Sequence, residues 1–171
     1  MKAIVVVDEK WGIGKAGRLL VHIPGDLKYF HEKTLGKVVV MGRTTLESLP
    51  GARPLSDRIT VVLTRNPAFQ AAFQSTASHG DCNVVSSVEE CLEYLKGVKE
   101  DDIYICGGDD VYRQFLPYCD ECLVTKIEGD FGADRFFEDL DANDEFTICS
   151  EGEPIIENGI SYRFMRYVRI R

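Results

Sequence analysis

The sequence predicts a single α/β domain, built on a twisted and mostly parallel central sheet. Short β-branched runs alternate with amphipathic segments along the chain, which is typical of such a sheet. Two runs, at 38–41 and 103–106, are continuously apolar, as central strands buried on both faces require. The length of 171 residues also fits one domain, so residues 1–171 are expected to fold as one unit.

The predicted sheet has about eight strands, and its last two form an antiparallel edge. A hairpin turn is expected at Asn158 and Gly159, because Asn-Gly is a strong two-residue turn signal. The strands are expected at residues 2–7, 37–41, 58–64, 82–85, 102–106, 121–127, 145–149 and 160–169.

About four flanking helices are expected from apolar residues at helical spacing. Pro24 and Gly36 bound the first helix, since proline suits the first helical position and glycine the position after the last. Ser86 or Ser87 is expected to cap the third helix. The predicted helices cover residues 25–35, 44–49, 88–97 and 109–116.

Residues 8–24 form an unusually long connection between a strand and a helix. This segment is too apolar for a free surface loop, and Gly12, Gly14 and Gly17 permit it to move. We therefore expect a mobile active-site loop that acts as a lid.

Residues 12–17 (GIGKAG) match the dinucleotide-binding pattern G-x-G-x-x-G. That motif requires a strand-to-helix turn, so that a pyrophosphate meets the helix N-terminus. Here residues 8–11 separate the glycines from the strand, and Pro24 precludes a continuous helix. We therefore expect no Rossmann site at this position.

Composition excludes several classes of protein. The net charge of −8 disfavours nucleic-acid binding, because an acidic surface repels phosphate backbones. The apolar run at 3–7 is too short to cross a bilayer, and nothing before it reads as a signal peptide. The six cysteines lie mostly in apolar runs, and the pair Cys119 and Cys122 lacks further metal ligands. These features predict a cytoplasmic protein without a metal site or a membrane partner.

Two strand-to-helix turns are candidate anion sites. Residues 41–45 (MGRTT) combine a glycine, Arg43 and two threonine hydroxyls. Residues 106–109 (CGGD) offer free backbone N–H groups. Either turn alone is equally well explained as glycine punctuation, but both end parallel strands, where open sheets bind ligands. Together they predict an extended anionic ligand such as a dinucleotide. Arg65, at the end of another strand, is either a contact for a further phosphate or a solvated surface charge.

Asp26 lies in the first turn of the first predicted helix and has two interpretations. An acidic residue there complements the helix dipole. Alternatively, Ile23, Leu27 and Phe30 form an apolar setting that would raise the pKa of the Asp26 carboxyl group. Such a carboxylate would suit an amidine-like ligand edge, whose N–H groups match its two oxygens.

Several segments, in order along nearly the whole chain, closely resemble the dihydrofolate reductase family. They are residues 13–14 (IG), 22–30 (HIPGDLKYF), 37–48 (KVVVMGRTTLES), 53–55 with Arg58, 106–108 with 111–112, and 123–127 (LVTKI). The resemblance implies reduction of 7,8-dihydrofolate to tetrahydrofolate by NADPH, for one-carbon metabolism, in a monomer that binds antifolate inhibitors. The related pyrimidine reductase of riboflavin synthesis is the alternative, but its substrate has no glutamate tail for Arg58.

The resemblance also implies roles for matching residues. Asp26 would hold the pterin 2-amino group and N3 and favour protonation of N5, with Thr125 in the same network, and Arg58 would bind the substrate α-carboxylate. The implied substrate site comprises Ile4, Val5, Val6, Asp26, Leu27, Phe30, Leu49, Arg58, Cys106 and Thr125. The implied cofactor site comprises Val6, Ile13, Gly14, Leu19, Gly42, Arg43, Thr44, Thr45, Leu63, Thr64, Arg65, Cys106, Gly107, Gly108, Asp109, Asp110, Val111 and Tyr112.

Three positions depart from the family pattern. Val21 stands where the family commonly has tryptophan, and the only tryptophan is Trp11. Asp109 follows Gly108 in place of a small residue, and Asp110 stands where many relatives have a cation for the 2′-phosphate. A like charge near that phosphate would weaken the preference for NADPH over NADH, unless Asp110 points away or pairs with an arginine.

Overall fold

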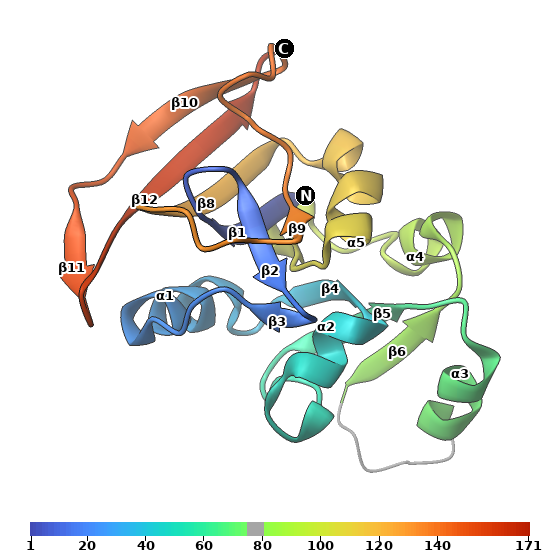
Figure 1. Cartoon of the computed structure of the whole chain (residues 1–171). Helices are drawn as coiled ribbons and strands as arrows, with labels where there is room; N and C mark the ends of the chain where they lie inside the picture. Colours follow the sequence, from blue (N-terminus) through green and yellow to red (C-terminus); the bar gives the residue numbers. More distant parts are fainter. Residues whose placement is uncertain (75–80) are drawn as a thin grey trace.

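The computed structural model of the chain describes residues 1–74 and 81–171 (Figure 1). Nine strands form the central sheet, in the order β10-β12-β8-β1-β7-β4-β5-β6, with β11 also paired to β12. The parallel part consists of β1 (Lys2–Val7), β4 (Val38–Gly42), β5 (Ile59–Leu63), β6 (Cys82–Val85), β7 (Ile103–Ile105) and β8 (Glu121–Ile127). The antiparallel edge consists of β10 (Phe146–Glu151), β11 (Ile155–Glu157) and β12 (Ile160–Arg169). The predicted mostly parallel sheet with an antiparallel C-terminal edge is confirmed.

The predicted hairpin turn is present, but it joins different strands than expected. Asn158 and Gly159 have φ values of 51° and 75°, the left-handed pair that a two-residue hairpin turn needs. The turn connects β12 to the short strand β11, which the sequence analysis missed. The predicted strand at 145–149 is β10, which pairs with the far half of β12.

The central strands are buried on both faces, as their continuous apolar runs predict. In β4, Val38 and Val40 pack into the core on one face of the sheet. Val39 and Met41 pack into the core on the other face. All four side chains are at most 4% exposed.

Helices cover both faces of the sheet (Figure 1). They are α1 (Pro24–Thr34), α2 (Arg43–Ser48), α3 (Pro67–Gln74), α4 (Val88–Tyr94) and α5 (Asp109–Phe115), with short 3-10 turns η1 (Pro50–Ala52), η2 (Glu100–Asp102) and η3 (Leu116–Tyr118). Cys91 of α4 and Phe115 of α5 pack on one face. Phe30 of α1 and Leu46 of α2 pack on the other. Among the described residues no helix is long and apolar enough to span a bilayer.

The expectation of about four helices was too low, because α3 was missed. Its start carries a local signal: the side-chain oxygen of Asn66 accepts the backbone N–H of Ala68 at 3.0 Å, and Pro67 occupies the first position. The other helix starts are confirmed. Pro24 opens α1, and the Ser87 hydroxyl caps α4.

The connection at 8–24 contains regular structure that was not predicted. It includes β2 (Gly12–Lys15) and β3 (Arg18–Leu19), which form a hairpin. Ala16 and Gly17 make its tight turn, with φ values of 51° and 75°. The GIGKAG segment is therefore not a strand-to-helix turn, and the rejection of a Rossmann site is confirmed.

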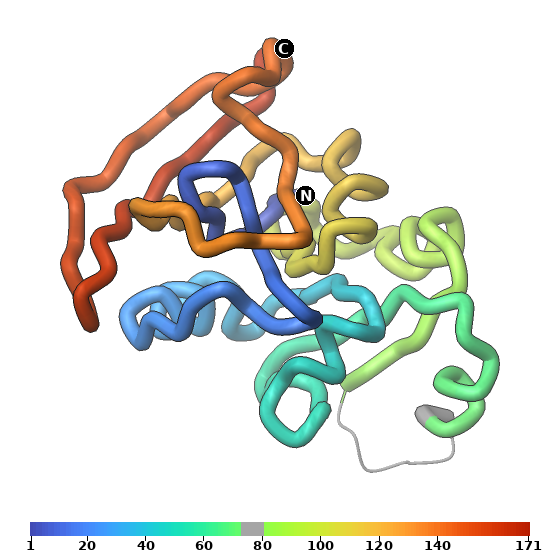
Figure 2. The backbone as a smooth tube through the Cα atoms, viewed as in Figure 1, coloured from blue at the N-terminus to red at the C-terminus, as the bar shows by residue number. Residues whose placement is uncertain are grey.

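The base of this segment is anchored to a distant part of the chain. β2 also pairs with β9 (Arg135–Phe136), and Figure 2 shows the orange segment that leads into β9 passing over the blue segment of β2. The buried Asp8 carboxylate accepts the backbone N–H groups of Gly12 at 2.8 Å and of Phe131 at 3.1 Å. Trp11 is buried and stacks with Phe137, so it belongs to the core rather than to an exposed lid.

Candidate active site

The two glycine turns predicted as separate anion sites form one surface. The backbone N–H of Gly42 donates to the carbonyl of Gly107 at 2.8 Å, and that of Cys106 donates to Val40 at 2.8 Å. A Cβ at Gly42 would lie 3.2 Å from a Val111 methyl group. This close approach explains why the position holds glycine.

The first part of the groove, here called the phosphate side, lies at the C-terminal ends of β4, β5 and β6. It is a hollow of about 630 Å³. The predicted cofactor residues that line it are Gly42, Arg43, Thr44, Thr45, Leu63, Thr64, Arg65, Gly108, Asp109, Asp110 and Val111. The sequence analysis missed Ser86, Ser87, Val88, Glu89, Arg113 and Gln114. Ser86 and Ser87 follow a parallel strand, so the rule that found the other turns would also have found them.

The second part of the groove, here called the lid side, lies under the β2–β3 hairpin. It is a hollow of about 370 Å³ that shares Thr44, Thr45, Gly108 and Asp109 with the phosphate side, so the two are continuous. Its other predicted members are Val5, Val6, Ile13, Gly14, Leu19, Cys106, Gly107 and Tyr112. The residues missed here are Lys15, Ala16, Gly17, Arg18, Ser48, Asp134 and Arg135. Asp134 and Arg135 carry no local signal, because the pairing of β9 with β2 brings them to the groove.

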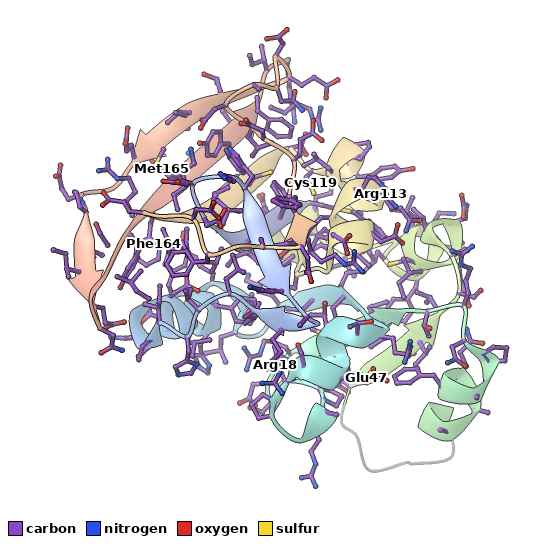
Figure 3. The ribbon with its side chains drawn as sticks, in the orientation of Figure 1. Arg18, Glu47, Arg113, Cys119, Phe164 and Met165 are labelled. Carbon is purple, nitrogen blue, oxygen red and sulfur yellow. The ribbon has the colours of Figure 1, made fainter. Side chains whose placement is uncertain are left out.

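The charged side chains of the phosphate side are partly or fully exposed, and most of them have an ion-pair partner. Arg43 bonds Glu47 at 3.0 Å. The Asp110 carboxylate is bound by Arg113, which lies on the side of α5 that faces α4 (Figure 3). Within the described part of the chain, Arg65 is exposed and has no ion-pair partner. Asp110 is therefore neutralised, and Arg65 is free to meet an anion.

The groove fits a dinucleotide. It is long, it has glycine backbone at its centre, and it has hydroxyl and guanidinium donors at one end. A Cβ at Gly107 would lie 3.0 Å from the Tyr112 ring, and one at Gly108 would lie 3.5 Å from the Thr45 hydroxyl. The two glycines thus let the 107–108 backbone pack closely against Tyr112 of α5 and Thr45 of α2. Among the described residues, no His, Cys, Asp and Glu cluster is arranged to hold a metal ion.

Asp26 lies in the first turn of α1 and faces β8. The Thr125 hydroxyl donates to its carboxylate at 2.7 Å, and Thr125 lies opposite Val6 in the sheet. Burial raises the pKa of Asp26, and the Thr125 hydrogen bond partly opposes that rise. The buried-carboxylate interpretation therefore describes this residue better than the dipole interpretation.

The apolar residues predicted around Asp26 belong to three packing clusters: Ile4, Phe30 and Leu49 share one, Val5 lies in a second, and Val6 packs against a third. Ile4 is buried, and Phe30 and Leu49 are partly buried against the same core. The Tyr112 hydroxyl donates to the Ile4 carbonyl at 2.7 Å and so fixes α5 against β1 next to this cluster. Leu27 differs, because its side chain is 41% exposed.

Arg58 is a buried cation held by neutral groups. It is 8% exposed, and its guanidinium donates to the Thr34 hydroxyl at 3.2 Å and the Ser56 carbonyl at 2.9 Å. Thr34 in turn donates to the Phe30 carbonyl, which ties Arg58 to α1. Burial lowers the pKa of Arg58. The negative charge of the neighbouring Asp57 partly opposes this lowering, but among the described residues Arg58 has no ion-pair partner. A buried charge that is hydrogen-bonded only to neutral groups is destabilising, and a ligand carboxylate would stabilise it. Thr34 was missed by the sequence analysis.

The comparisons with known proteins agree with this geometry. The family model for dihydrofolate reductase matches residues 1–169. The dihydrofolate reductase of Bacillus subtilis (strain 168) is 35% identical and covers 96% of this chain and 91% of its own length. That of Staphylococcus haemolyticus is 32% identical, covering 98% and 95%. The bifunctional dihydrofolate reductase-thymidylate synthase of Glycine max is 37% identical, but the chain spans only 34% of its length.

A solved structure extends the similarity to the whole fold. The dihydrofolate reductase from Enterococcus faecalis, complexed with NADP(H) and RAB-propyl, has a TM-score of 0.81 and 33% identity. The alignment covers 99% of this chain and 96% of that one. These similarities do not favour the pyrimidine reductase alternative. The chain belongs to the dihydrofolate reductase family.

Proposed function

We propose that this chain reduces 7,8-dihydrofolate to 5,6,7,8-tetrahydrofolate with hydride from NADPH. One observation carries the proposal: a largely buried carboxylate, Asp26, is fixed by Thr125 close to a groove that fits a dinucleotide. Val6 connects the two, because it lines the groove and lies opposite Thr125 in the sheet.

On the substrate side, meaning the region around Asp26 and Arg58, the protein controls where the proton of the reaction is held. NADPH supplies the hydride when bound, while the protein supplies orientation and electrostatics. The Asp26 carboxylate accepts N–H bonds from the pterin 2-amino group and N3, and its negative charge favours a proton on N5. Thr125 holds the carboxylate in position. Phe30 and Leu49 contact the apolar part of the substrate, where antifolate inhibitors would compete.

Arg58 binds the α-carboxylate of the substrate glutamate. Its guanidinium is pre-positioned by Thr34 and Ser56, which bind it through neutral oxygens, so Asp57 acts on it only through space. A forked bond to a carboxylate supplies the direct ion pair that these partners do not. This contact distinguishes folates from substrates without a glutamate tail.

The phosphate side holds the cofactor phosphates. Arg43, Thr44 and Thr45 bind them at the start of α2, and the glycine turn faces the pyrophosphate and nicotinamide. Thr64 and Arg65 bind the 2′-phosphate. The pairing of Asp110 with Arg113 reduces the repulsion that Asp110 would otherwise exert.

The β2–β3 hairpin acts as a lid over the lid side of the groove. Its base is fixed through Asp8, whereas Lys15 and Arg18 at its tip are exposed. Trypsin cleavage after Lys10, Lys15 or Arg18 should therefore slow severalfold when NADPH and a folate analogue are bound together. Unchanged cleavage in the ternary complex would contradict a closing lid.

We further infer a monomer that works in the cytoplasm. All six cysteines are free thiols, which fits a reducing compartment. Size-exclusion chromatography with light scattering tests the monomer, and fractionation of the source cells tests the compartment.

The decisive experiment is the loss of absorbance at 340 nm when the protein is mixed with NADPH and dihydrofolate. We expect turnover in the wild type. Tight NADPH binding without turnover would contradict the proposal and indicate a nucleotide-sensing protein instead.

A further inference from the structure

The helix that carries Asp26 begins without a local cap. Ile23, at the N-cap, has no side-chain oxygen, and Pro24 has no N–H group. The first N–H groups of a helix have no partner within the helix and need an outside acceptor. Asp26 is in the first turn, but its carboxylate is bound to Thr125 on the sheet.

The acceptor comes from the C-terminal hairpin. The backbone N–H of Gly25 donates to the Glu157 carboxylate at 2.7 Å, across 132 residues of sequence. Glu157 is the last residue of β11 and pairs with Ile160 around the tight turn. A rigid two-residue turn thus holds the carboxylate over the start of α1.

The hairpin also closes the space above this helix turn. A Cβ at Gly25 would lie 2.5 Å from the Tyr162 hydroxyl and 3.2 Å from the Glu157 carboxylate. Tyr162 is 3% exposed, so it cannot move aside freely. Only glycine permits this close approach between the hairpin and α1.

Strand β12 contacts both elements that form the Asp26–Thr125 hydrogen bond, namely α1 and β8. In the sheet, Phe164 lies opposite Thr125, the hydrogen-bond donor to Asp26. Its ring stacks on Tyr29 of α1, with ring centroids 4.1 Å apart, and Figure 3 shows Phe164 between β12 and that helix. The hairpin therefore fixes the helix relative to the strand that orients its carboxylate.

We propose that Glu157 is a positioning residue, which caps α1 from the C-terminal hairpin and thereby sets where Asp26 presents its carboxylate to the substrate. The inference rests on the proposed function of Asp26. A charged acceptor at a helix N-terminus combines a charge-assisted bond with a favourable dipole interaction. A small tilt of α1 would displace Asp26, and displacements near 1 Å can reduce rates by about a hundredfold.

The titratable groups that face Asp26 are three phenols. They are Tyr29 on α1, Tyr112 on α5 and Tyr162 on β12, and burial raises the pKa of each. They remain uncharged near neutral pH. A change near neutral pH in the pH profile of activity therefore reports on Asp26. Glu157 lies on the other side of Tyr162 and acts on Asp26 indirectly.

Two conservative variants test the proposal. Glu157→Asp keeps the charge but is one methylene shorter, so it loses the contact with Gly25. Glu157→Gln loses the charge but keeps the length and an acceptor oxygen. We expect kcat with dihydrofolate at pH 7 to fall about tenfold in Glu157→Asp, and to stay within about twofold of wild type in Glu157→Gln. The Kd for NADPH should not change in either.

The pH profile separates positioning from simple stabilisation. In Glu157→Asp a displaced Asp26 carboxylate favours the proton on N5 less, so the pH above which activity falls should shift downward. Glu153→Asp is the matched control, because Glu153 lies in the same segment but is exposed. It should behave as wild type.

The proposal is overturned if Glu157→Asp lowers only the melting temperature and keeps the wild-type kcat and pH profile. It is also overturned if both variants at 157 lose activity equally, because the contact would then not depend on reach. Asp26→Asn, measured in parallel, separates a failure of the proposed role of Asp26 from a failure of the positioning role of Glu157. If it retains wild-type turnover, the proposed role of Asp26 fails. If it is inactive while Glu157→Asp is normal, only the positioning role fails.

Discussion

The region around Asp26 and Arg58, which is the proposed substrate side, and the phosphate side of the groove hold their charges in opposite ways. Around the substrate position, Asp26 and Arg58 are largely buried and bonded to neutral partners, namely threonine hydroxyls and a backbone carbonyl. On the phosphate side, charges are partly or fully exposed and most are ion-paired, as in the Asp110–Arg113 pair, whose side chains are 56% and 74% exposed.

This difference determines how easily each side exchanges partners. Exposed ion pairs contribute about 0–1 kcal/mol, so phosphates can replace the carboxylate partners at little cost. A buried charge with neutral partners is destabilising until a ligand compensates it, and it cannot turn to solvent. We therefore expect substitutions on the substrate side to have the larger effects.

Asp26→Asn should have the largest effect. The amide cannot stabilise a protonated pterin, so turnover at pH 7 should fall by about 10²–10⁴-fold, the usual worth of a positioned acid–base group. The deficit should shrink at low pH, where solvent protonates the substrate. Initial rates from pH 5 to pH 8 measure it, and circular dichroism checks that the variant is folded.

Arg58→Ala should raise the KM for dihydrofolate at least tenfold, since a charge-assisted forked bond contributes about 1.5–3 kcal/mol. NADPH affinity should not change. Arg53→Ala, in the same segment but exposed, is the control. A loss of NADPH affinity with an unchanged substrate KM would show that the two ends of the groove were assigned in reverse.

Arg65→Ala should have a smaller effect, confined to one cofactor. We expect wild type to prefer NADPH over NADH by about 30–150-fold, which corresponds to about 2–3 kcal/mol. Arg65→Ala should remove most of this preference by acting on NADPH, and Asp110→Arg should widen it. The measurement is kcat/KM for both cofactors at fixed ionic strength. Equal losses with NADH would show that Arg65 does not bind the 2′-phosphate.

The smallest effect concerns stability. Burial raises the pKa of Asp26 in the folded state, so the folded protein retains a proton that the unfolded chain has released. The free energy of unfolding therefore falls as the pH rises from the pKa of Asp26 in the unfolded chain to its raised pKa in the folded protein. Asp26→Asn removes this pH dependence. Its melting temperature should exceed that of wild type at pH 8, with the difference shrinking at pH 5. A difference that grows on acidification would contradict a raised pKa.

The residues of the groove show where sequence reasoning worked. The turns at Gly42 and Gly107 were found because each glycine directly follows a buried parallel strand, and such strand ends lie together at one edge of the sheet. Asp26 was found because its apolar neighbours recur at helical spacing. Thr34 was missed, because its position in a helix does not show that its side chain meets the distant Arg58. Arg113 was also missed, although it pairs with Asp110 at i,i+3 and helical spacing could have indicated that contact.

By itself, the sequence determined most local features of this protein: the long strands of the sheet, four of the five α-helices among the described residues, the tight turn at Asn158 and the glycine turns. These features depend on neighbouring residues, with periods of 2 or 3.6 and specific turn chemistry.

Only the tertiary structure decided the contacts between distant residues. Examples are the pairing of β9 with β2 of the β2–β3 hairpin and the contact of Glu157 with Gly25 at the start of α1. Such contacts follow from sheet register and from the packing of whole elements, to which many side chains each contribute a little. These many small contributions come from the whole chain, so no short segment of sequence predicts their combined effect.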